Sequence, residues 1–212
     1  MEIIRFRVRF SISGRLAYLS HLDVLSAVEK AIRRSSLPIR YSEGFNPHMI
    51  LSWGPAHGVG VWGDQEWVDF DFVSRPASDW VLTLNEVLPD DLQIQEAFQI
   101  PLETSALMAC VQSITYEVFL QGANFFALTE AIGQFLIEEH HPYLRISPKG
   151  NKEIDLRPLV EELVVFEQQD AVCLRMTCRS GPGAIPKPAE LVKTLAPDAR
   201  IISVCRKAIA LL

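Results

Sequence analysis

Residues 15–48, RLAYLSHLDVLSAVEKAIRRSSLPIRYSEGFNPH, predict one helix between two polar loops. Ser20 can cap the start of this helix with its hydroxyl, and Asp23, three residues later, can complete a capping box. Apolar residues recur at helical spacing inside the stretch and predict one buried face. Because proline cannot continue a helix, the helix ends before Pro38. The predicted helix therefore covers residues 20–35.

Strands surround this helix in residues 1–103. Residues 4–12 alternate strictly between apolar and polar side chains, which is typical of a half-buried strand. The patterns that follow the helix predict strands at 39–41 with 49–52, at 66–73 and at 92–100, and a helix at 76–88. The order strand, helix, strand, strand, helix, strand is that of a ferredoxin-like βαββαβ half.

Residues 104–212 repeat this order of elements. The patterns predict strands at 111–120, 163–166, 172–177 and 200–209, helices at 124–139 and 187–195, and two extra short strands at 143–146 and 153–156. The duplication rests on element order alone, because no convincing residue-level repeat links the halves. Residues 101–105 are the expected junction. The sequence thus predicts an α+β protein with two tandem ferredoxin-like halves and antiparallel sheets.

Four motifs carry a family resemblance: SHLD at 20–23, LPIRYSEGFNPH at 37–48, EWVDFDF at 66–72 and IDLRPLV at 154–160. They resemble the radical-SAM-linked family of unknown function and are spread over most of the chain. The resemblance implies that a radical SAM protein is the partner of this chain, and it implies no established activity.

Cysteine spacing indicates that the chain holds no iron–sulfur cluster itself. The CxxxCxxC arrangement that resembles radical SAM enzymes is absent, and the spacing of the cysteines fits neither zinc nor disulfide frameworks. The four cysteines are Cys110, Cys173, Cys178 and Cys205. On one strand, Cys173 and Cys178 would point to opposite faces. We expect reduced structural thiols, no cofactor and no metal.

Composition is that of an ordinary soluble globular protein, with 49% hydrophobic and 22% charged residues. No apolar run is long enough to span a bilayer, and the N-terminus resembles a charged strand rather than a signal peptide, so we expect a cytoplasmic protein without membrane contact. The net charge of −6 divides into +4 for residues 1–48 and −10 for the remainder. This asymmetry favours a localised anionic partner. Alternatively, Arg5, Arg7 and Arg9 line the solvent face of a strand.

Cationic and aromatic side chains in residues 15–48 predict a surface for phosphate and stacking contacts. Arginines beside aromatic rings are typical of single-stranded RNA binding. A solvated helix face with a Glu29–Arg33 pair explains the same charges without a ligand. The residues expected to bind substrate are Arg15, Tyr18, His21, Arg33, Arg34, Arg40, Ser42, Phe45, Asn46 and His48.

Three residues are candidates for acid–base chemistry: His21, Asp23 and His48. Residues two apart on a helix do not share a face, and His48 can approach the other two only through the fold. A histidine at a helix start is more often a capping or packing residue, which argues against a metal site. His57, among glycines, can belong to the same surface. Asp69 and Asp71 are two residues apart on a predicted strand, so they share one face, and we expect this face to be solvated.

Three functions compete. The first is a non-catalytic accessory protein that works with a radical SAM protein and holds RNA or another anionic substrate. The second is a protein–protein adaptor that docks on that partner without nucleic acid. The third is a small enzyme using His21, Asp23 and His48, which is disfavoured because the chain has no cluster-binding cysteine motif of its own. The first requires the helix and the loop after it to form one exposed pocket.

Overall fold

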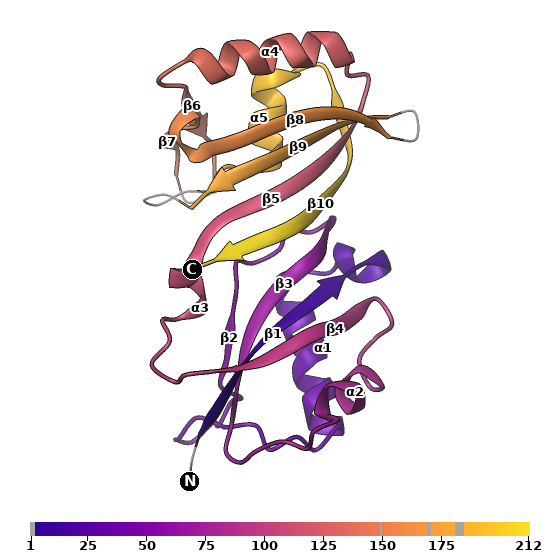
Figure 1. The fold of residues 1–212 in the computed structure, drawn as a ribbon, viewed down its shortest axis with the longest axis vertical. Helices are drawn as coiled ribbons and strands as arrows, with labels where there is room; N and C mark the ends of the chain where they lie inside the picture. Colours follow the sequence, from indigo (N-terminus) through magenta and orange to yellow (C-terminus); the bar gives the residue numbers. More distant parts are fainter. Residues whose placement is uncertain (1–2, 149, 169–170, 181–184) are drawn as a thin grey trace. The chain divides into compact units, whose positions relative to one another are not determined.

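The computed structural model describes residues 3–148, 150–168, 171–180 and 185–212 (Figure 1). The protein is a mixed α/β protein whose paired strands are mostly antiparallel. It divides into two compact units, residues 1–111 with Leu212 and residues 112–211. Residues 101–105, the expected junction, therefore belong to the first unit.

The first unit contains the elements that surround the 15–48 stretch. Its strands lie in the order β4-β1-β3-β2, and each neighbouring pair is antiparallel. Both longer helices, α1 and α2, contribute to one hydrophobic core on a single face of this sheet. The elements are β1 (Ile4–Ile12), the 3-10 helix η1 (Gly14–Tyr18), α1 (His21–Arg34), β2 (Leu51–Trp53), β3 (Val61–Phe72), α2 (Trp80–Asn85), β4 (Leu92–Ile100) and α3 (Leu107–Cys110).

The predicted capping box at the start of α1 is confirmed. The backbone N–H of Asp23 donates to Ser20 Oγ at 3.2 Å, and the Ser20 N–H donates to Asp23 Oδ2 at 3.3 Å. The helix then buries its predicted apolar face through Val24, Val28 and Ile32. The predicted span of residues 20–35 differs from the observed one by a single residue at each end.

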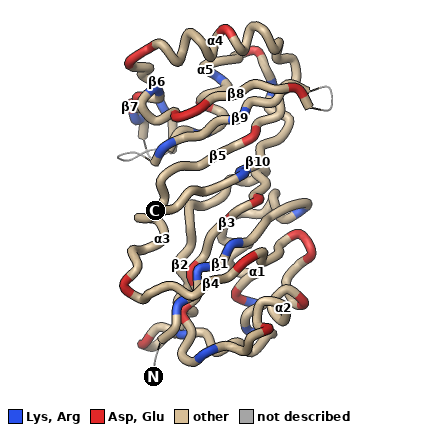
Figure 2. The backbone as a smooth tube through the Cα atoms, viewed as in Figure 1, with Lys and Arg blue, Asp and Glu red and all other residues tan. Residues whose placement is uncertain are grey.

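Opposite that core, β1 and β3 carry a ladder of ion pairs. Figure 2 marks the charged positions along the backbone. Arg7 donates to both oxygens of Asp69 at 2.8 and 3.0 Å, and Arg5 donates to both oxygens of Asp71 at 2.6 and 3.0 Å. Asp69 and Asp71 are each only 2% exposed. The expectation of a solvated acidic face was therefore wrong, because both carboxylates find arginine partners across the sheet. Their charge raises the pKa of both arginines through these hydrogen bonds.

The second unit has the strand order β10-β5-β9-β8 and a separate two-stranded sheet, β6-β7. Helices α4 and α5 pack on one face of the larger sheet, with Leu128 and Leu191 in its core. Cys173 and Cys178 both lie on β9, at positions that face opposite sides of the sheet. The elements are β5 (Val111–Gln121), α4 (Phe125–Ile137), β6 (Pro142–Arg145), β7 (Lys152–Asp155), η2 (Arg157–Leu159), β8 (Val160–Gln168), β9 (Ala171–Arg179), α5 (Pro188–Leu195) and β10 (Arg200–Leu211).

Differences from the predicted elements are local. The helix expected at 76–88 covers only Trp80–Asn85, and the strand expected at 66–73 begins earlier, at Val61. The short helices η1, α3 and η2 were not predicted, because their three to five residues are too few to show a period. Within the described ranges, no helix combines the length and the apolar composition needed to cross a membrane.

Replacing Asp69 by Asn is expected to lower the free energy of unfolding by about 3–5 kcal/mol, because the Arg7 charge stays buried without its counter-charge. Urea unfolding followed by tryptophan fluorescence measures this change. The matched control is Glu96→Gln, which removes the exposed partner of Arg9 and should cost less than about 1 kcal/mol. Equal costs for the two variants would contradict the role of the buried pair.

Candidate functional site

Helix α1 separates the predicted binding residues into two groups. It has 14 residues, which makes it about 20 Å long. The group at its first end is Arg15, Tyr18, His21 and Asp23, and the group at and beyond its last turn is Arg33, Arg34, Arg40, Ser42, Phe45, Asn46 and His48.

Strand pairing agrees with this separation. Ile39 bridges Phe72 at the end of β3, whereas Ile12, just before η1, faces Gly63 near the start of β3. His48 follows the Ile39 end, so it does not meet His21 and Asp23. The three acid–base candidates therefore do not form one site, and the predicted residues do not share a single pocket.

The loop after α1, residues 40–50, is a hairpin whose two sides are joined by hydrogen bonds. The Ile50 N–H donates to the Arg40 carbonyl at 2.9 Å, and the Ser42 N–H donates to the His48 carbonyl at 2.8 Å. Ser42 Oγ also lies 2.8 Å from His48 Nδ1 and accepts from the His48 N–H at 3.1 Å. The base of hairpin 40–50 is thus closed by four hydrogen bonds.

Phe45 stands at the tip of hairpin 40–50. Gly44 before it has a φ of +119°, a conformation that residues with a side chain rarely adopt. The Phe45 side chain is fully exposed. Of the two alternatives for this residue, a hydrophobic plug and an exposed stacking surface, the second describes its position.

The arginines at this end of α1 keep much of their hydrogen-bonding capacity. Arg33 Nη2 lies 3.8 Å from Glu29 Oε2, so the predicted pair exists but is too long for a hydrogen bond. Arg40 Nη1 lies 3.7 Å from Asp71 Oδ2, a carboxylate whose oxygens already accept from Arg5. Arg34 is exposed and donates from Nη2 to the Val87 carbonyl at 2.7 Å.

At the first end of α1, His21 belongs to an aromatic cluster. Its ring centroid lies 5.6 Å from that of His57 and 6.1 Å from that of Trp53. These residues and Glu66 line a cavity of about 10 Å³, roughly the room for one water molecule. Among the described residues, no set of three or more His, Cys, Asp or Glu side chains is arranged to hold a metal ion.

Exposed apolar side chains surround the same end. Tyr18, Leu22 and Val59 are all exposed, and we call them the Tyr18 patch. The Gly60 N–H donates to the Ala17 carbonyl at 2.7 Å, which fixes the loop that carries Val59 beside η1. Sequence reasoning missed Val59, because a valine in a glycine-rich loop gives no sign of its neighbours.

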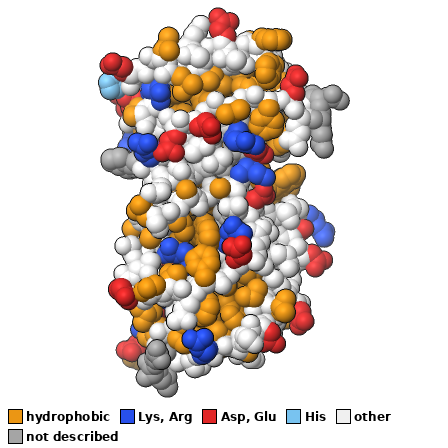
Figure 3. Space-filling model, in the orientation of Figure 1, with side chains coloured by type: hydrophobic (Ala, Val, Ile, Leu, Met, Phe, Trp, Pro, Cys, Tyr) orange, Lys and Arg blue, Asp and Glu red, His pale blue; other side chains and the backbone are white. Residues whose placement is uncertain are grey.

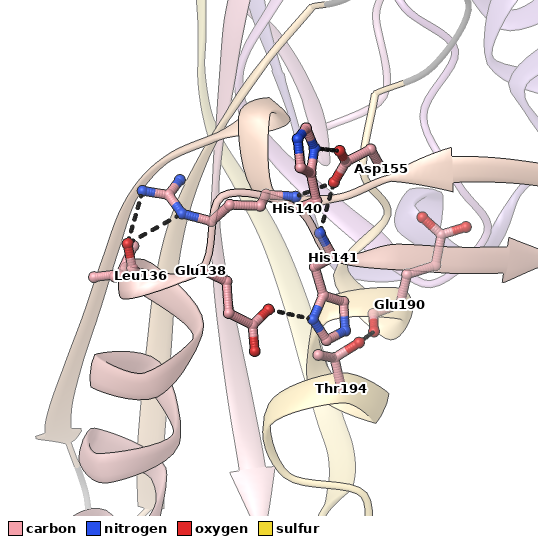
Figure 4. A network of polar contacts seen from close by, with 8 residues as sticks. Leu136, Glu138, His140, His141, Asp155, Glu190 and Thr194 are labelled. Carbon is pink, nitrogen blue, oxygen red and sulfur yellow. Dashed lines mark hydrogen bonds and ion pairs between the residues drawn. The ribbon is translucent and has the colours of Figure 1, made fainter.

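The IDLRPLV motif has a structural place in the second unit (Figure 4). Arg157 donates to the Leu136 carbonyl at 3.1 and 3.3 Å and so caps the end of α4. Asp155 accepts from the His141 N–H at 2.7 Å and contacts His140 Nδ1 at 2.6 Å. The rings of His140 and His141 point away from each other, and His141 Nδ1 instead lies 2.7 Å from a Glu138 oxygen.

These contacts set the pKa of Asp155. Burial acts to raise it, but the hydrogen bonds from the His141 N–H, the His140 ring and the Arg157 N–H outweigh burial and hold the pKa below its usual 3.8. Burial raises the pKa of two cysteine thiols on β9, that of Cys173 to about 11 and that of Cys178 to about 12. Both thiols are therefore poor nucleophiles at neutral pH.

Fold and site together define a two-unit α/β protein with arginines and an exposed aromatic ring at one end of a capped helix and an apolar patch at the other. The chain belongs to the family DUF2344, described as an uncharacterized protein conserved in bacteria, whose model matches residues 5–188. No curated protein matches the chain.

A comparison with solved structures found a similar fold in a component of one complex and a weaker match in a second chain, of which only the first bears on the fold. A chain in the crystal structure of a Cbf5-Nop10-Gar1 complex matches with a TM-score of 0.55 and 11% identity, over 96% of this chain and 48% of that one. This chain therefore spans about half of that one, and at such low identity the likeness concerns the fold alone. An unknown protein from Galdieria sulphuraria matches with a TM-score of 0.29 and 14% identity, over 95% of this chain and 99% of that one.

Replacing Asp155 by Asn should lower stability at pH 6–7, and the loss should shrink as the pH falls below 3.8. A carboxylate whose pKa is lowered in the folded state stabilises the protein above its unfolded pKa and loses that effect as it is protonated. Urea midpoints of both proteins across this pH range measure the effect. Glu153→Gln, at an exposed position of the same strand, is the control. A deficit of Asp155→Asn that stays constant with pH would contradict the assignment.

Proposed function

We propose that this chain is a non-catalytic binding protein that works with a radical SAM protein and holds an RNA segment or another anionic substrate. The observation that carries the proposal is the fully exposed Phe45 at the tip of hairpin 40–50, at the same end of α1 as three exposed or partly exposed arginines, Arg33, Arg34 and Arg40. The radical SAM partner is supported by the resemblance of the SHLD, GFNPH, EWVDFDF and IDLRPLV segments.

The chemistry of hairpin 40–50 suits a single-stranded nucleic acid. Stacking of a base on an aromatic ring contributes about 1–3 kcal/mol and tolerates every base. Arg33, Arg34 and Arg40 supply N–H donors and positive charge for phosphate. Because Ser42 and His48 close the base of the hairpin, Phe45 is presented on an ordered turn, and less conformational entropy is lost on binding.

An enzyme built on His21, Asp23 and His48 is not supported. The length of α1 separates His48 from the other two, and the side chain of Asp23 is engaged in the capping box. The buried thiols, with their raised pKa values, offer no activated nucleophile either.

A protein–protein adaptor is the second candidate, and the Tyr18 patch favours it. Three exposed apolar side chains at one end of α1 form the kind of surface that a protein partner covers. The adaptor and the RNA-holding function use opposite ends of α1, so one chain can combine them: the Tyr18 patch would dock on the radical SAM protein while hairpin 40–50 holds the substrate.

We also infer that each unit is a ferredoxin-like half. The orders β4-β1-β3-β2 and β10-β5-β9-β8 become identical when the strands of each unit are numbered along the chain, leaving out the separate pair β6-β7. Both correspond to the βαββαβ arrangement of elements.

Phe45→Ala is expected to weaken binding of a single-stranded RNA by about 5-fold to 100-fold, as loss of one stacked base implies. The double variant Arg33→Ala, Arg34→Ala should also weaken binding and should lower the slope of log affinity against log salt by about 1.4. Fluorescence anisotropy at several salt concentrations measures both effects. Phe126→Ala, at an exposed phenylalanine of α4, is the matched control. An RNA affinity that changes neither with the salt concentration nor in Phe45→Ala would refute the proposal.

The adaptor function predicts that Leu22→Asp prevents the chain from forming a complex with the radical SAM protein of its host while its RNA affinity is retained. Size-exclusion chromatography of the two purified proteins measures complex formation. Leu82→Asp, at an equally exposed leucine of α2, is the control. A complex that survives Leu22→Asp would argue against docking through the Tyr18 patch.

A further inference from the structure

One face of the sheet in the second unit carries no helix among the described residues. Helices α4 and α5 pack on the other face, where Leu174 and Met176 of β9 join the core. The helix-free face therefore contains the intervening positions of β5, β9 and β8. One row across it is Phe119, Cys173 and Phe166, and the next row is Glu117, Arg175 and Val164.

The Arg175 side chain lies on the outer side of this face, above its neighbours. Its guanidinium carbon lies 5.1 Å from the centre of the Phe166 ring, within cation–π range. Its Nε and Nη2 donate to Glu117 Oε1 at 3.0 and 2.6 Å. The Arg175 side chain is 45% exposed and that of Glu117 only 11%, so the guanidinium faces outward and the carboxylate lies beneath it.

A second ion pair on β9 has the same asymmetry. Arg179 Nε donates to Glu161 Oε1 at 2.9 Å, and the side chains are 63% and 33% exposed. The two arginines are four residues apart on one strand, which places them about 13 Å from each other. Although the visible face of the molecule mixes both signs (Figure 3), and Glu162 is exposed at the β8 edge, the outermost charges along β9 are cationic.

The corresponding face of the first unit is different. There Arg7 and Asp69, on the corresponding strands β1 and β3, are buried, with side chains only 6% and 2% exposed. A ligand could reach that guanidinium only after the covering side chains moved. The other cross-strand arginines of β1, Arg5 and Arg9, have side chains 22% and 24% exposed, about half the exposure of Arg175 or less.

We propose that the helix-free face of β5, β9 and β8 is a second contact surface for single-stranded RNA. A base stacks on the Arg175 guanidinium above Phe166, and Arg179 contacts a phosphate. Single-stranded RNA is commonly recognised on open sheets of this kind, through aromatic rings and guanidinium planes. The inference rests on the proposed RNA-holding function and extends it from hairpin 40–50 to the second unit.

The test uses the full chain and a 16-nucleotide oligouridine carrying a photoreactive uridine. Arg175→Lys keeps the charge over Glu117 but removes the planar group, and it should weaken binding by about fivefold or more. Arg179→Gln should weaken binding and lower the salt slope by about 0.7. Lys193→Gln, at an exposed position on α5, should change neither. Photocrosslinks should map to peptides of β8 and β9 as well as to hairpin 40–50.

The possible failures are distinguishable. Crosslinks confined to hairpin 40–50, with unchanged affinity of Arg175→Lys and Arg179→Gln, would overturn this inference and leave the proposed function standing. No binding of the oligouridine by the unmodified chain at low salt would overturn both. Loss of the complex with the radical SAM protein in Arg175→Lys, with RNA affinity retained, would assign the face to a protein and also overturn the inference.

Discussion

The ion pairs between β1 and β3, one buried and one partly buried, are the constraint on which the first unit depends. Arg7 with Asp69 and Arg5 with Asp71 fix the register of the two strands, because a slip of either strand by one residue would turn its own charges into the apolar core and leave those of the other strand unpaired. Register in turn fixes hairpin 40–50: the Arg40 N–H donates to the Asp71 carbonyl at 2.7 Å, and β2, just beyond the hairpin, pairs with β3. The hairpin that carries the exposed Phe45 is therefore anchored to β3 on both of its sides.

Both units contain an arginine–carboxylate pair between their first and third strands, but the exposure of the arginine differs. In the first unit the arginine is on the first strand and the carboxylate on the third, and both are buried; in the second unit the glutamate is on the first strand and the arginine on the third, and the arginine is exposed. One arrangement stabilises a closed face and the other presents a cation over an aromatic ring. A shared strand order thus supports two surfaces of different chemistry.

Sequence patterns within a few residues predicted much of the fold, and the features that they missed depend on contacts between residues far apart in the sequence. Strand β1, helix α1 and its capping box follow from alternation, spacing and capping, all of which act within a few residues. Burial of Asp69 was not predictable, because its partner Arg7 lies 62 residues away in sequence. The candidate site failed as a single pocket for a related reason: whether the loops before and after α1 approach each other depends on the fold, and α1 keeps His21 and His48 at opposite ends. For Phe45 the sequence left a hydrophobic plug and an exposed stacking surface as alternatives, because turn chemistry is local and does not show what the side chain at the tip contacts.

The proposed RNA binding depends above all on contact between Phe45 of hairpin 40–50 and a nucleobase. The most direct test places 4-fluorophenylalanine at position 45 and follows its fluorine resonance by NMR while single-stranded RNA is added. Stacking of a base on Phe45 should give a saturable shift of this resonance, with the same midpoint as binding measured by anisotropy. A resonance that stays unchanged at RNA concentrations where anisotropy reports saturation would contradict it.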